Sequence, residues 1–247
     1  MKSTIRTLSR LRCSNRGGRS YRERVPVAIS VTQSNGEKMS RIVLFGAGGR
    51  AGRHIWQQGR SRGHDVVAVL RNPATHPEIG GVSGDVTNVA DVRRLTAGAD
   101  VVINASARID ISPDQFFAAS TRALIEGLQA GRLLVIGIGT TLEPTPGIRL
   151  MDIPDFPYEA KPFTVGHALE LELLQQSPGE LDWVVITPPP VVLAEHAETG
   201  GALLVSAGPE LLVSSDPTFT YTDLAVATVD EIDNATHHRT QIAVIRR

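Results

Sequence analysis

Four glycines follow a short apolar run close to residue 40 of this 247-residue chain. Residues 42–45 read Ile-Val-Leu-Phe, and the next seven residues are Gly46-Ala-Gly-Gly-Arg-Ala-Gly52. A buried strand that turns sharply into a helix leaves backbone N–H groups free at the helix N-terminus, where they bind the pyrophosphate of a dinucleotide. Glycine allows the positive φ of such a turn and the close approach of a phosphate. The pattern therefore predicts a dinucleotide-binding turn, with a purely structural turn as the alternative. Its candidate residues are Gly46, Gly48, Gly49, Arg50, Ala51 and Gly52.

Apolar residues make up 41% of the chain but aromatic residues only 4%, so aliphatic side chains must build the core. This composition suits buried parallel strands, which read as continuous aliphatic runs. The length fits one substantial core. The single cysteine, Cys13, excludes an intrachain disulfide and a cysteine-based zinc site, and no other metal-ligand spacing is present. No apolar stretch reaches the roughly 18 residues of a membrane span. We therefore expect a cytoplasmic protein with no metal and no membrane partner.

Residues 1–38 differ in charge from the rest of the chain. They carry nine lysines and arginines and two glutamates, a net charge of +7, whereas the whole chain carries −1. A basic segment of this kind is compatible with a transit peptide, or with a tail that contacts nucleic acid or anionic surfaces. We favour a third interpretation, a disordered leader or a mis-assigned start, because Met39-Ser40-Arg41 leads directly into the first strand. Residues 39–247 are then a single domain.

Beyond the glycine turn, aliphatic runs alternate with segments of helical periodicity. The expected strands are residues 64–70, 81–86 (a short strand and turn), 99–105, 133–137, 181–187 and 241–245. The expected helices are residues 87–96, 113–129, 162–176 and 221–233. Their expected N-caps are Thr87 or Asn88, Ser112, and Thr220 or Thr222. A loop is expected over residues 145–157 and a small hairpin over residues 200–214.

This alternation predicts an α/β fold of the Rossmann type, a doubly wound and mostly parallel sheet with helices on both faces. We expect a small C-terminal appendage on the substrate side, with elements at roughly residues 142–165 and 188–222. Ligands bind such sheets at the carboxyl ends of the strands, near the point where the strand order reverses. The loops that follow the strands are therefore where binding residues are expected.

Arg71-Asn72 follows the second expected strand, at the position that selects between the two nicotinamide dinucleotides. A carboxylate there binds the adenosine ribose and favours NAD, whereas an arginine accommodates the 2′-phosphate of NADP. No acid lies between Val66 and Pro73, and a guanidinium group suits phosphate. We predict NADP(H) as the cofactor, with NAD(H) as the alternative, bound by Arg50, Arg71 and Asn72. The competing interpretation of Arg71 is a solvated charge.

Two further pairs of residues follow later strands. Asp85 could accept a hydrogen bond from the adenine amino group, with the backbone of Val86 beside it, or it could be a simple turn or cap aspartate. Ala105 and Ser106 follow the strand at 99–105, where small side chains would let the cofactor lie close to the backbone. Close packing is the competing explanation for that pair.

Thr140, Tyr158 and Lys161 are the candidates for catalysis. Short-chain dehydrogenases use a hydroxyl after the fifth strand and a tyrosine four residues before a lysine. Here Tyr158 and Lys161 are three residues apart, which still shares one helix face, yet the proline after Lys161 places both at a helix entrance. Tyr158 is either a proton donor or a tyrosine packed over the site, and Lys161 could instead hold the nicotinamide ribose or a phosphate. His167 and Glu170 either reach the cleft or are solvated.

The glycine turn is one of several motifs that together match a known family. The others are Arg71-Asn72-Pro73, Gly84-Asp85-Val86-Thr87, the proline-rich residues 146–157, Lys161-Pro162 and residues 181–188. On these motifs the chain from residue 39 onward resembles the atypical short-chain dehydrogenase/reductases of the NAD(P)H-binding, NmrA-like group. Within that group it is most similar to bacterial NADH-flavin reductases related to biliverdin reductase B. It departs from them at Gly48, where threonine is common, and at Glu159-Ala160, which separates Tyr158 from the lysine.

The resemblance implies hydride transfer from the nicotinamide to a flavin, a quinone or a similar planar acceptor, with flavin as a substrate rather than a tightly bound group. Such a reaction needs little acid–base help from the protein. The alternative is a non-catalytic redox sensor that binds NADP(H), as NmrA-like proteins do. A sugar-nucleotide epimerase is disfavoured by the tyrosine–lysine spacing, and hydrolysis by the lack of a nucleophile-elbow motif. We expect a small-molecule acceptor, no nucleic-acid partner for the globular part, and a monomer or homodimer.

Overall fold

The computed structural model of the chain describes residues 27–28, 39–129, 131–154, 156, 161–195, 202–214 and 218–247. Within residues 1–38 it describes only Val27–Ala28, so the expected leader stays a prediction. Tyr158 lies outside the described residues, so its role stays a prediction.

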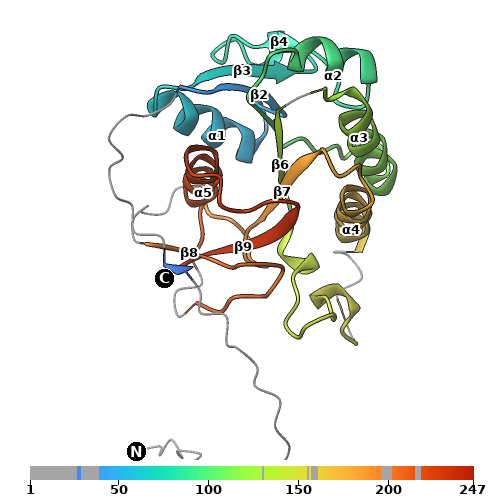
Figure 1. The fold of residues 1–247 in the computed structure, drawn as a ribbon, viewed down its shortest axis with the longest axis vertical. Helices are drawn as coiled ribbons and strands as arrows, with labels where there is room; N and C mark the ends of the chain where they lie inside the picture. The colour runs from blue at the N-terminus through green and yellow to red at the C-terminus, as the bar shows by residue number, and fades with distance from the viewer. Residues whose placement is uncertain are drawn as a thin grey trace, which may run out of the picture.

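Nine strands of the described residues form one sheet, in the order β1-β8-β9-β7-β6-β5-β2-β3-β4 (Figure 1). All neighbouring pairs from β9 to β4 are parallel, whereas β8 pairs antiparallel with β9 and β1 pairs antiparallel with β8. The strands are β1 Val27–Ala28, β2 Arg41–Phe45, β3 Asp65–Leu70, β4 Val82–Ser83, β5 Val101–Asn104, β6 Arg132–Ile136, β7 Asp182–Thr187, β8 Leu203–Val205 and β9 Thr240–Arg246.

The strand order reverses at β2. From β2 the chain proceeds to β3 and β4 on one side, and then returns to place β5, β6 and β7 on the other side. This is the doubly wound arrangement of a Rossmann-type sheet, so the predicted fold class is confirmed. The reversal leaves a crevice at the carboxyl ends of β2 and β5, the place where ligands of such sheets bind.

Five α-helices of the described residues cover the two faces of the sheet (Figure 1). Helices α1 and α5 pack together on one face, and α2, α3 and α4 follow one another on the other face. They are α1 Arg50–Ser61, α2 Val89–Thr96, α3 Pro113–Gly127, α4 Lys161–Gln175 and α5 Tyr221–Asp233. Short 3-10 helices lie at η1 Pro73–Thr75, η2 Gly139–Thr141 and η3 Leu150–Asp152.

Alternate residues of each central strand point into two separate cores. On β2, Ile42 and Leu44 face the core that includes residues of α1 and α5, whereas Val43 and Phe45 face the core that includes residues of α2, α3 and α4. All four side chains are buried. Side chains alternate across a strand, so a strand with helices on both faces must be apolar throughout. The aliphatic runs of the sequence have this origin.

The helix starts agree with two of the three expected caps. Asn88 caps α2 through its side chain, and Thr220 forms a reciprocal capping box with Asp223 at the start of α5. Ser112 precedes α3 as expected, but its hydroxyl donates to the carboxylate of Asp114 instead of capping the helix backbone. The cap prediction at Ser112 is therefore right in position and wrong in chemistry.

The hairpin expected over residues 200–214 is wrong. The strand described in this range, β8, pairs antiparallel with β9, and its register joins Leu204 to Ile245. Strand β9 already pairs with β7 on its other edge, and its free edge offers backbone N–H and C=O groups that a neighbouring strand can satisfy. Short-range turn signals in the sequence do not reveal a pairing partner some 40 residues away. The loop expected over residues 145–157 contains η3.

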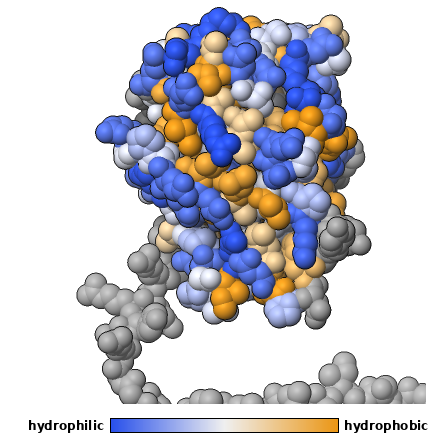
Figure 2. Space-filling view, turned by 90° about the vertical axis from the view of Figure 1, so that its right-hand side faces the viewer, coloured by the Kyte–Doolittle hydropathy of each residue, from blue (hydrophilic) through white to orange (hydrophobic). Residues whose placement is uncertain are grey.

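Figure 2 views the face that carries α2, α3 and α4, where hydrophilic residues surround apolar residues gathered along the middle of the face. Across the described part of the chain, the structure contains no helix with both the length and the apolar character that a bilayer crossing demands.

Candidate functional site

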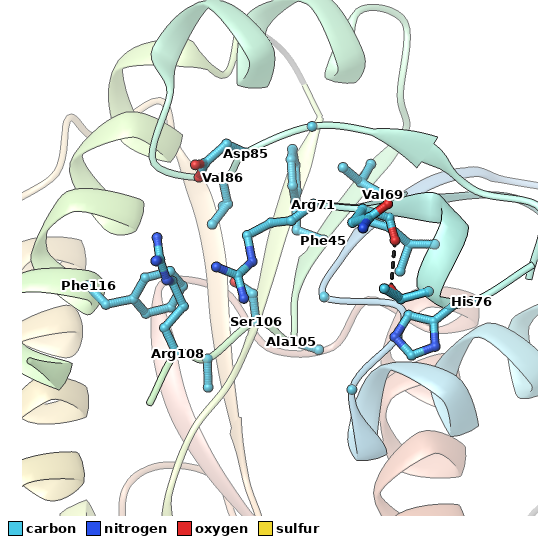
Figure 3. A pocket seen from close by; sticks show the side chains of 18 residues that line it. Phe45, Val69, Arg71, His76, Asp85, Val86, Ala105, Ser106, Arg108 and Phe116 are labelled. Carbon is cyan, nitrogen blue, oxygen red and sulfur yellow. Dashed lines mark hydrogen bonds between the residues drawn. The ribbon is translucent and has the colours of Figure 1, made fainter. Parts of the chain in front are cut away.

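A cavity of about 530 Å³ opens at the crevice where the strand order reverses (Figure 3). Its walls come from the loops that follow β2, β3, β4 and β5, together with the ends of β2 and β3 and Phe116 of α3. Nine of the predicted cofactor-binding residues line it, namely Gly46, Gly48, Gly49, Arg71, Asn72, Asp85, Val86, Ala105 and Ser106. The sequence therefore located this cavity correctly, although the role of each residue toward a cofactor stays a prediction.

The glycine turn takes a shape that side chains would prevent. Gly46 has φ +80°, and a Cβ there would lie 2.6 Å from the backbone of Ser106. A Cβ at Gly52 would lie 2.1 Å from the carbonyl oxygen of Gly46, so α1 can approach the turn only with glycine at this position. Gly49 precedes α1 and has no side chain to cap it, and the N–H groups of the first turn can therefore bind an anion.

Two arginines lie at the cavity and share one carboxylate. Arg71 follows β3 and Arg108 lies in the loop after β5; both line the cavity, and their guanidinium groups extend into it in Figure 3. Asp110 accepts a hydrogen bond of 2.9 Å from Nε of Arg108, and its Oδ2 lies 3.8 Å from Nη1 of Arg71. The hydrogen bond from Arg108 is the main reason that the pKa of Asp110 lies far below its usual value. Asp110 is therefore an anion held between two cationic groups.

Asp85 and Asn72 support the backbone as well as lining the cavity. Oδ1 of Asp85 accepts hydrogen bonds from the backbone N–H of Thr87, at 2.9 Å, and from its hydroxyl, at 2.7 Å. Oδ1 of Asn72 accepts from the backbone N–H of Ala74 at 3.1 Å and caps η1. The hydrogen bonds of Asp85 are those of a turn aspartate, the second of its two sequence interpretations. Binding of adenine by Asp85 stays a prediction.

A buried polar chain supports the cavity wall at Ser106. Asn104, the last residue of β5, accepts from the backbone N–H of Ser106 at 3.2 Å and places its amide nitrogen 3.4 Å from Glu170. Glu170 is 1% exposed and lies 3.0 Å from Nδ1 of His167, whose ring packs against Phe117. Glu170 is thus neither solvated nor at the cavity lining. Through Asn104, Glu170 supports the β5 loop. Nothing in the sequence indicated this role.

Three predicted residues of the glycine turn do not line the cavity. The guanidinium of Arg50 lies over the ring of Tyr221, 5.5 Å from its centroid, and 4.0 Å from Glu195. Ala51 packs against the core on the α1 side, and Gly52 allows the close contact with Gly46 described above. Arg50 is the first residue of α1, and its side chain lies against the first residue of α5.

Thr140 and Lys161, the two candidate catalytic residues that the structure describes, do not line the cavity. Thr140 lies in η2, and its hydroxyl is 2.8 Å from the hydroxyl of Thr164 on α4. Lys161 is the exposed first residue of α4. The two positions lie beyond β6, on the far side of β5 from the glycine turn. Their catalytic roles stay predictions.

Sequence reasoning missed Arg108 and His76 as lining residues. Both lie within a few residues of a strand end, in the loops after β5 and β3, so a systematic reading of these loops could have found them. Nothing in the local sequence indicates that either side chain turns toward the crevice, because loop backbone directions depend on tertiary packing.

A family model described as NAD(P)H-binding matches residues 46–235. The chain belongs to this NAD(P)H-binding family. The uncharacterized protein YwnB of Bacillus subtilis (strain 168) is 30% identical over 217 residues, which are 83% of this chain and 98% of that protein. A nicotinamide dinucleotide is therefore the ligand class of this protein, and the family resemblance found in the sequence is confirmed.

Solved structures share the fold over most of the chain. A protein of Streptococcus pneumoniae TIGR4 described as a "putative NADH-flavin reductase" is 26% identical with a TM-score of 0.73, covering 84% of this chain and 100% of its own. A protein of Bacteroides thetaiotaomicron described as a "putative epimerase" is 27% identical with a TM-score of 0.73, covering 84% and 97%. Proteins that share this fold are therefore named for different reactions, so the fold alone does not specify the reaction.

The cavity suits a nicotinamide dinucleotide on its own geometry. The glycine turn leaves the N-terminus of α1 open to a pyrophosphate, and two guanidinium groups that share one carboxylate lie at the cavity, where they could bind a further phosphate. Ala105 and Ser106 are small enough for a ligand to lie against the β5 loop. The residues present therefore fit the group that the family binds.

Proposed function

We propose that this protein is an NADPH-preferring reductase that transfers hydride to a flavin, a quinone or a similar planar acceptor. The observation that carries the cofactor preference is the pair Arg71 and Arg108 at the cavity, with Arg71 at the strand end where an NAD-specific site has an acid. Guanidinium groups bind phosphate through charge and a planar fork of donors.

Each part of the cavity has one role in this proposal. The N–H groups at the start of α1 bind the pyrophosphate, and the glycine turn lets it approach. Arg71 and Arg108 hold the 2′-phosphate, while Asp85 and Val86 border the adenine. The side chains of Ala105 and Ser106 are small, so the ribose and nicotinamide can lie along the β5 loop. The bound nicotinamide supplies the hydride.

The proposed acceptor class depends on how much acid–base catalysis the reaction needs from the protein. Reduction of a flavin or quinone needs two flat rings held in contact and little proton transfer from side chains. Epimerisation of a sugar needs a placed acid–base group, and the three-residue spacing of Tyr158 and Lys161 departs from the four-residue spacing that supplies one in short-chain dehydrogenases. The name of the Streptococcus pneumoniae protein agrees with the first reaction and supports a flavin-type acceptor.

Steady-state oxidation of NADPH with FMN, riboflavin or a benzoquinone tests the proposal. We expect turnover above the uncatalysed rate with at least one of these acceptors, and a lower KM for NADPH than for NADH. Binding of NADPH without turnover on any of them would contradict the reductase and support an NADP(H)-binding redox sensor. Turnover with a higher KM for NADPH than for NADH would contradict the cofactor preference alone.

Replacing Arg71 by alanine should weaken binding of NADPH about 10- to 30-fold and leave binding of NADH nearly unchanged. A hydrogen bond to a charged group contributes about 1.5–3 kcal/mol, and the exposure of Arg71 places it at the lower end. Titration of the intrinsic fluorescence of NADPH and NADH measures both constants. Arg93→Ala, on the exposed face of α2, is the matched control. An equal loss for both cofactors would contradict recognition of the 2′-phosphate by Arg71.

Replacing Asp110 by asparagine should strengthen NADPH binding, because its carboxylate occupies the arginines that the phosphate needs. Because this ion pair is exposed to solvent, we expect only a modest gain in affinity, about two- to fivefold. The same fluorescence titration measures the change, with Asp114→Asn as the control on the neighbouring helix. Weaker binding in Asp110→Asn would show instead that Asp110 positions Arg108.

A further inference from the structure

The imidazole of His76 lies directly on the glycine turn. His76 follows η1 in the loop after β3 and lines the cavity (Figure 3). A Cβ added to Gly48 would lie 2.4 Å from Cδ2 and 2.5 Å from Nε2 of this ring. Any residue other than glycine at position 48 would therefore displace the ring. The glycine at this position therefore leaves the space that the imidazole ring occupies.

Arg53 fixes the hydrogen-bonding direction of the ring. Nη2 of Arg53, on the first turns of α1, lies 2.9 Å from Nδ1 of His76. A guanidinium group can only donate, so Nδ1 must accept, and the proton of the neutral imidazole is then on Nε2. Nε2 is the ring nitrogen beside Gly48. His76 thus presents an N–H donor beside the glycine turn at the cavity wall.

The charges around His76 favour an anion at this position. Arg53 lies behind the ring, and Arg71 follows β3 a few residues before it along the same cavity wall. Glu78 is the acid of this group, 3.7 Å from Nδ1 of His76 and 3.5 Å from Nη2 of Arg53. It therefore lies near Nδ1, whereas Nε2 lies on the other side of the ring, beside Gly48.

We propose that His76, oriented by Arg53, donates Nε2–H to the 2′-phosphate of the cofactor and selects NADPH over NADH together with Arg71. This inference rests on the proposed function, which supplies the cofactor. His76 is then a second hydrogen-bond donor beside the guanidinium of Arg71. The role of Gly48 is to leave the space that the imidazole ring occupies.

Calorimetric titration with adenosine 2′,5′-bisphosphate and with 5′-AMP tests the inference without any turnover. His76→Phe keeps the ring volume and removes the donor, so we expect binding of the bisphosphate to weaken about tenfold and binding of 5′-AMP to stay within about twofold. His76→Gln places an amide N–H near the same position and should restore most of the loss. His238→Phe, a histidine exposed near Asp182, is the matched control.

Gly48→Ala provides a second variant, because its Cβ must push the ring away while the histidine itself remains. It should lose bisphosphate binding as His76→Phe does, with an unfolding temperature near that of the wild type. An equal loss of both ligands in His76→Phe would overturn the inference in favour of a purely structural role. Unchanged bisphosphate binding in His76→Phe would overturn it as well. Equal binding of both ligands by the wild type would overturn the proposed NADPH preference itself.

Discussion

Gly52→Ala should weaken binding of NADPH and NADH alike by about 30-fold or more. The new Cβ would lie 2.1 Å from the carbonyl oxygen of Gly46, which is backbone and cannot rotate away. Overpacking of this kind costs about 1–3 kcal/mol or more, and a contact this short belongs at the upper end of that range. Helix α1 must then shift from the turn, and its N–H groups no longer converge on the pyrophosphate.

Intrinsic helix propensity acts in the opposite direction and is too small to compensate. Alanine is favoured over glycine within a helix by about 1 kcal/mol, so a net cost of about 2 kcal/mol or more remains. Gly179→Ala is the matched control, because a Cβ at Gly179 meets no atom within 4 Å. Fluorescence titration of both cofactors, with thermal unfolding to follow the fold, measures the effect. Binding that stays within about threefold of the wild type would show that α1 can move without disturbing the turn.

Arg132→Met should lower the free energy of unfolding by about 3–5 kcal/mol, because removal of one partner leaves the other charge buried and uncompensated. Arg132 on β6 donates to Oε1 of Glu231 at 2.7 Å, and its Nε lies 3.0 Å from Asp182. Both Arg132 and Glu231 are buried. The cluster ties β6 to the last turns of α5, at the opposite end of the strands from the cavity.

The pH dependence of stability should change with this substitution. Burial raises the pKa of Glu231, but hydrogen bonds from His237 and Arg132 outweigh it and hold the pKa below its ordinary value of 4.5. A carboxylate with a depressed native pKa stabilises the fold above its unfolded-state pKa, and this contribution is lost as the pH falls through the native pKa. The wild type should therefore lose stability below about pH 4.5, and Arg132→Met should lose less over the same range because one donor is gone.

Urea unfolding at several pH values measures both effects. Arg94→Met is the matched control, because the same substitution there breaks an exposed ion pair with Asp91 on α2. Exposed pairs contribute about 0.2–1 kcal/mol, so the control should cost less than about 1 kcal/mol. A similar small loss in Arg132→Met would show that the buried cluster does not stabilise the native state.

Local patterns in the sequence predicted the sheet and the cavity. Aliphatic runs such as residues 42–45 mark strands that are covered on both faces, and the glycines that follow them permit a turn that few other residues can make. Arg71 was found because it directly follows a strand, and the carboxyl ends of parallel strands meet at one edge of the sheet. These features depend on residues that are close together in the chain, so the sequence alone is enough to predict them.

Tertiary packing decided the features that depend on distant residues. The partner of β8 is β9, some 40 residues later, and the supposed hairpin was wrong for that reason. Arg108 and His76 turn toward the cavity because their loops pack there, and no local pattern fixes a loop direction. Thr140 follows β6 in chain order, but only the structure shows that its hydroxyl lies beside Thr164 on α4, and its catalytic role stays a prediction.

The sequence by itself therefore determined the fold class, the family and the location of the cavity. These depend on periodicity, on glycine sterics and on the order of elements along the chain. The tertiary structure alone decided which side chains face the cavity, that Asp110 lies between Arg71 and Arg108, and that His76 is seated on Gly48. The physical reason is that a side chain's neighbours across a crevice come from loops on different strands, whose approach is set by the packing of the whole sheet.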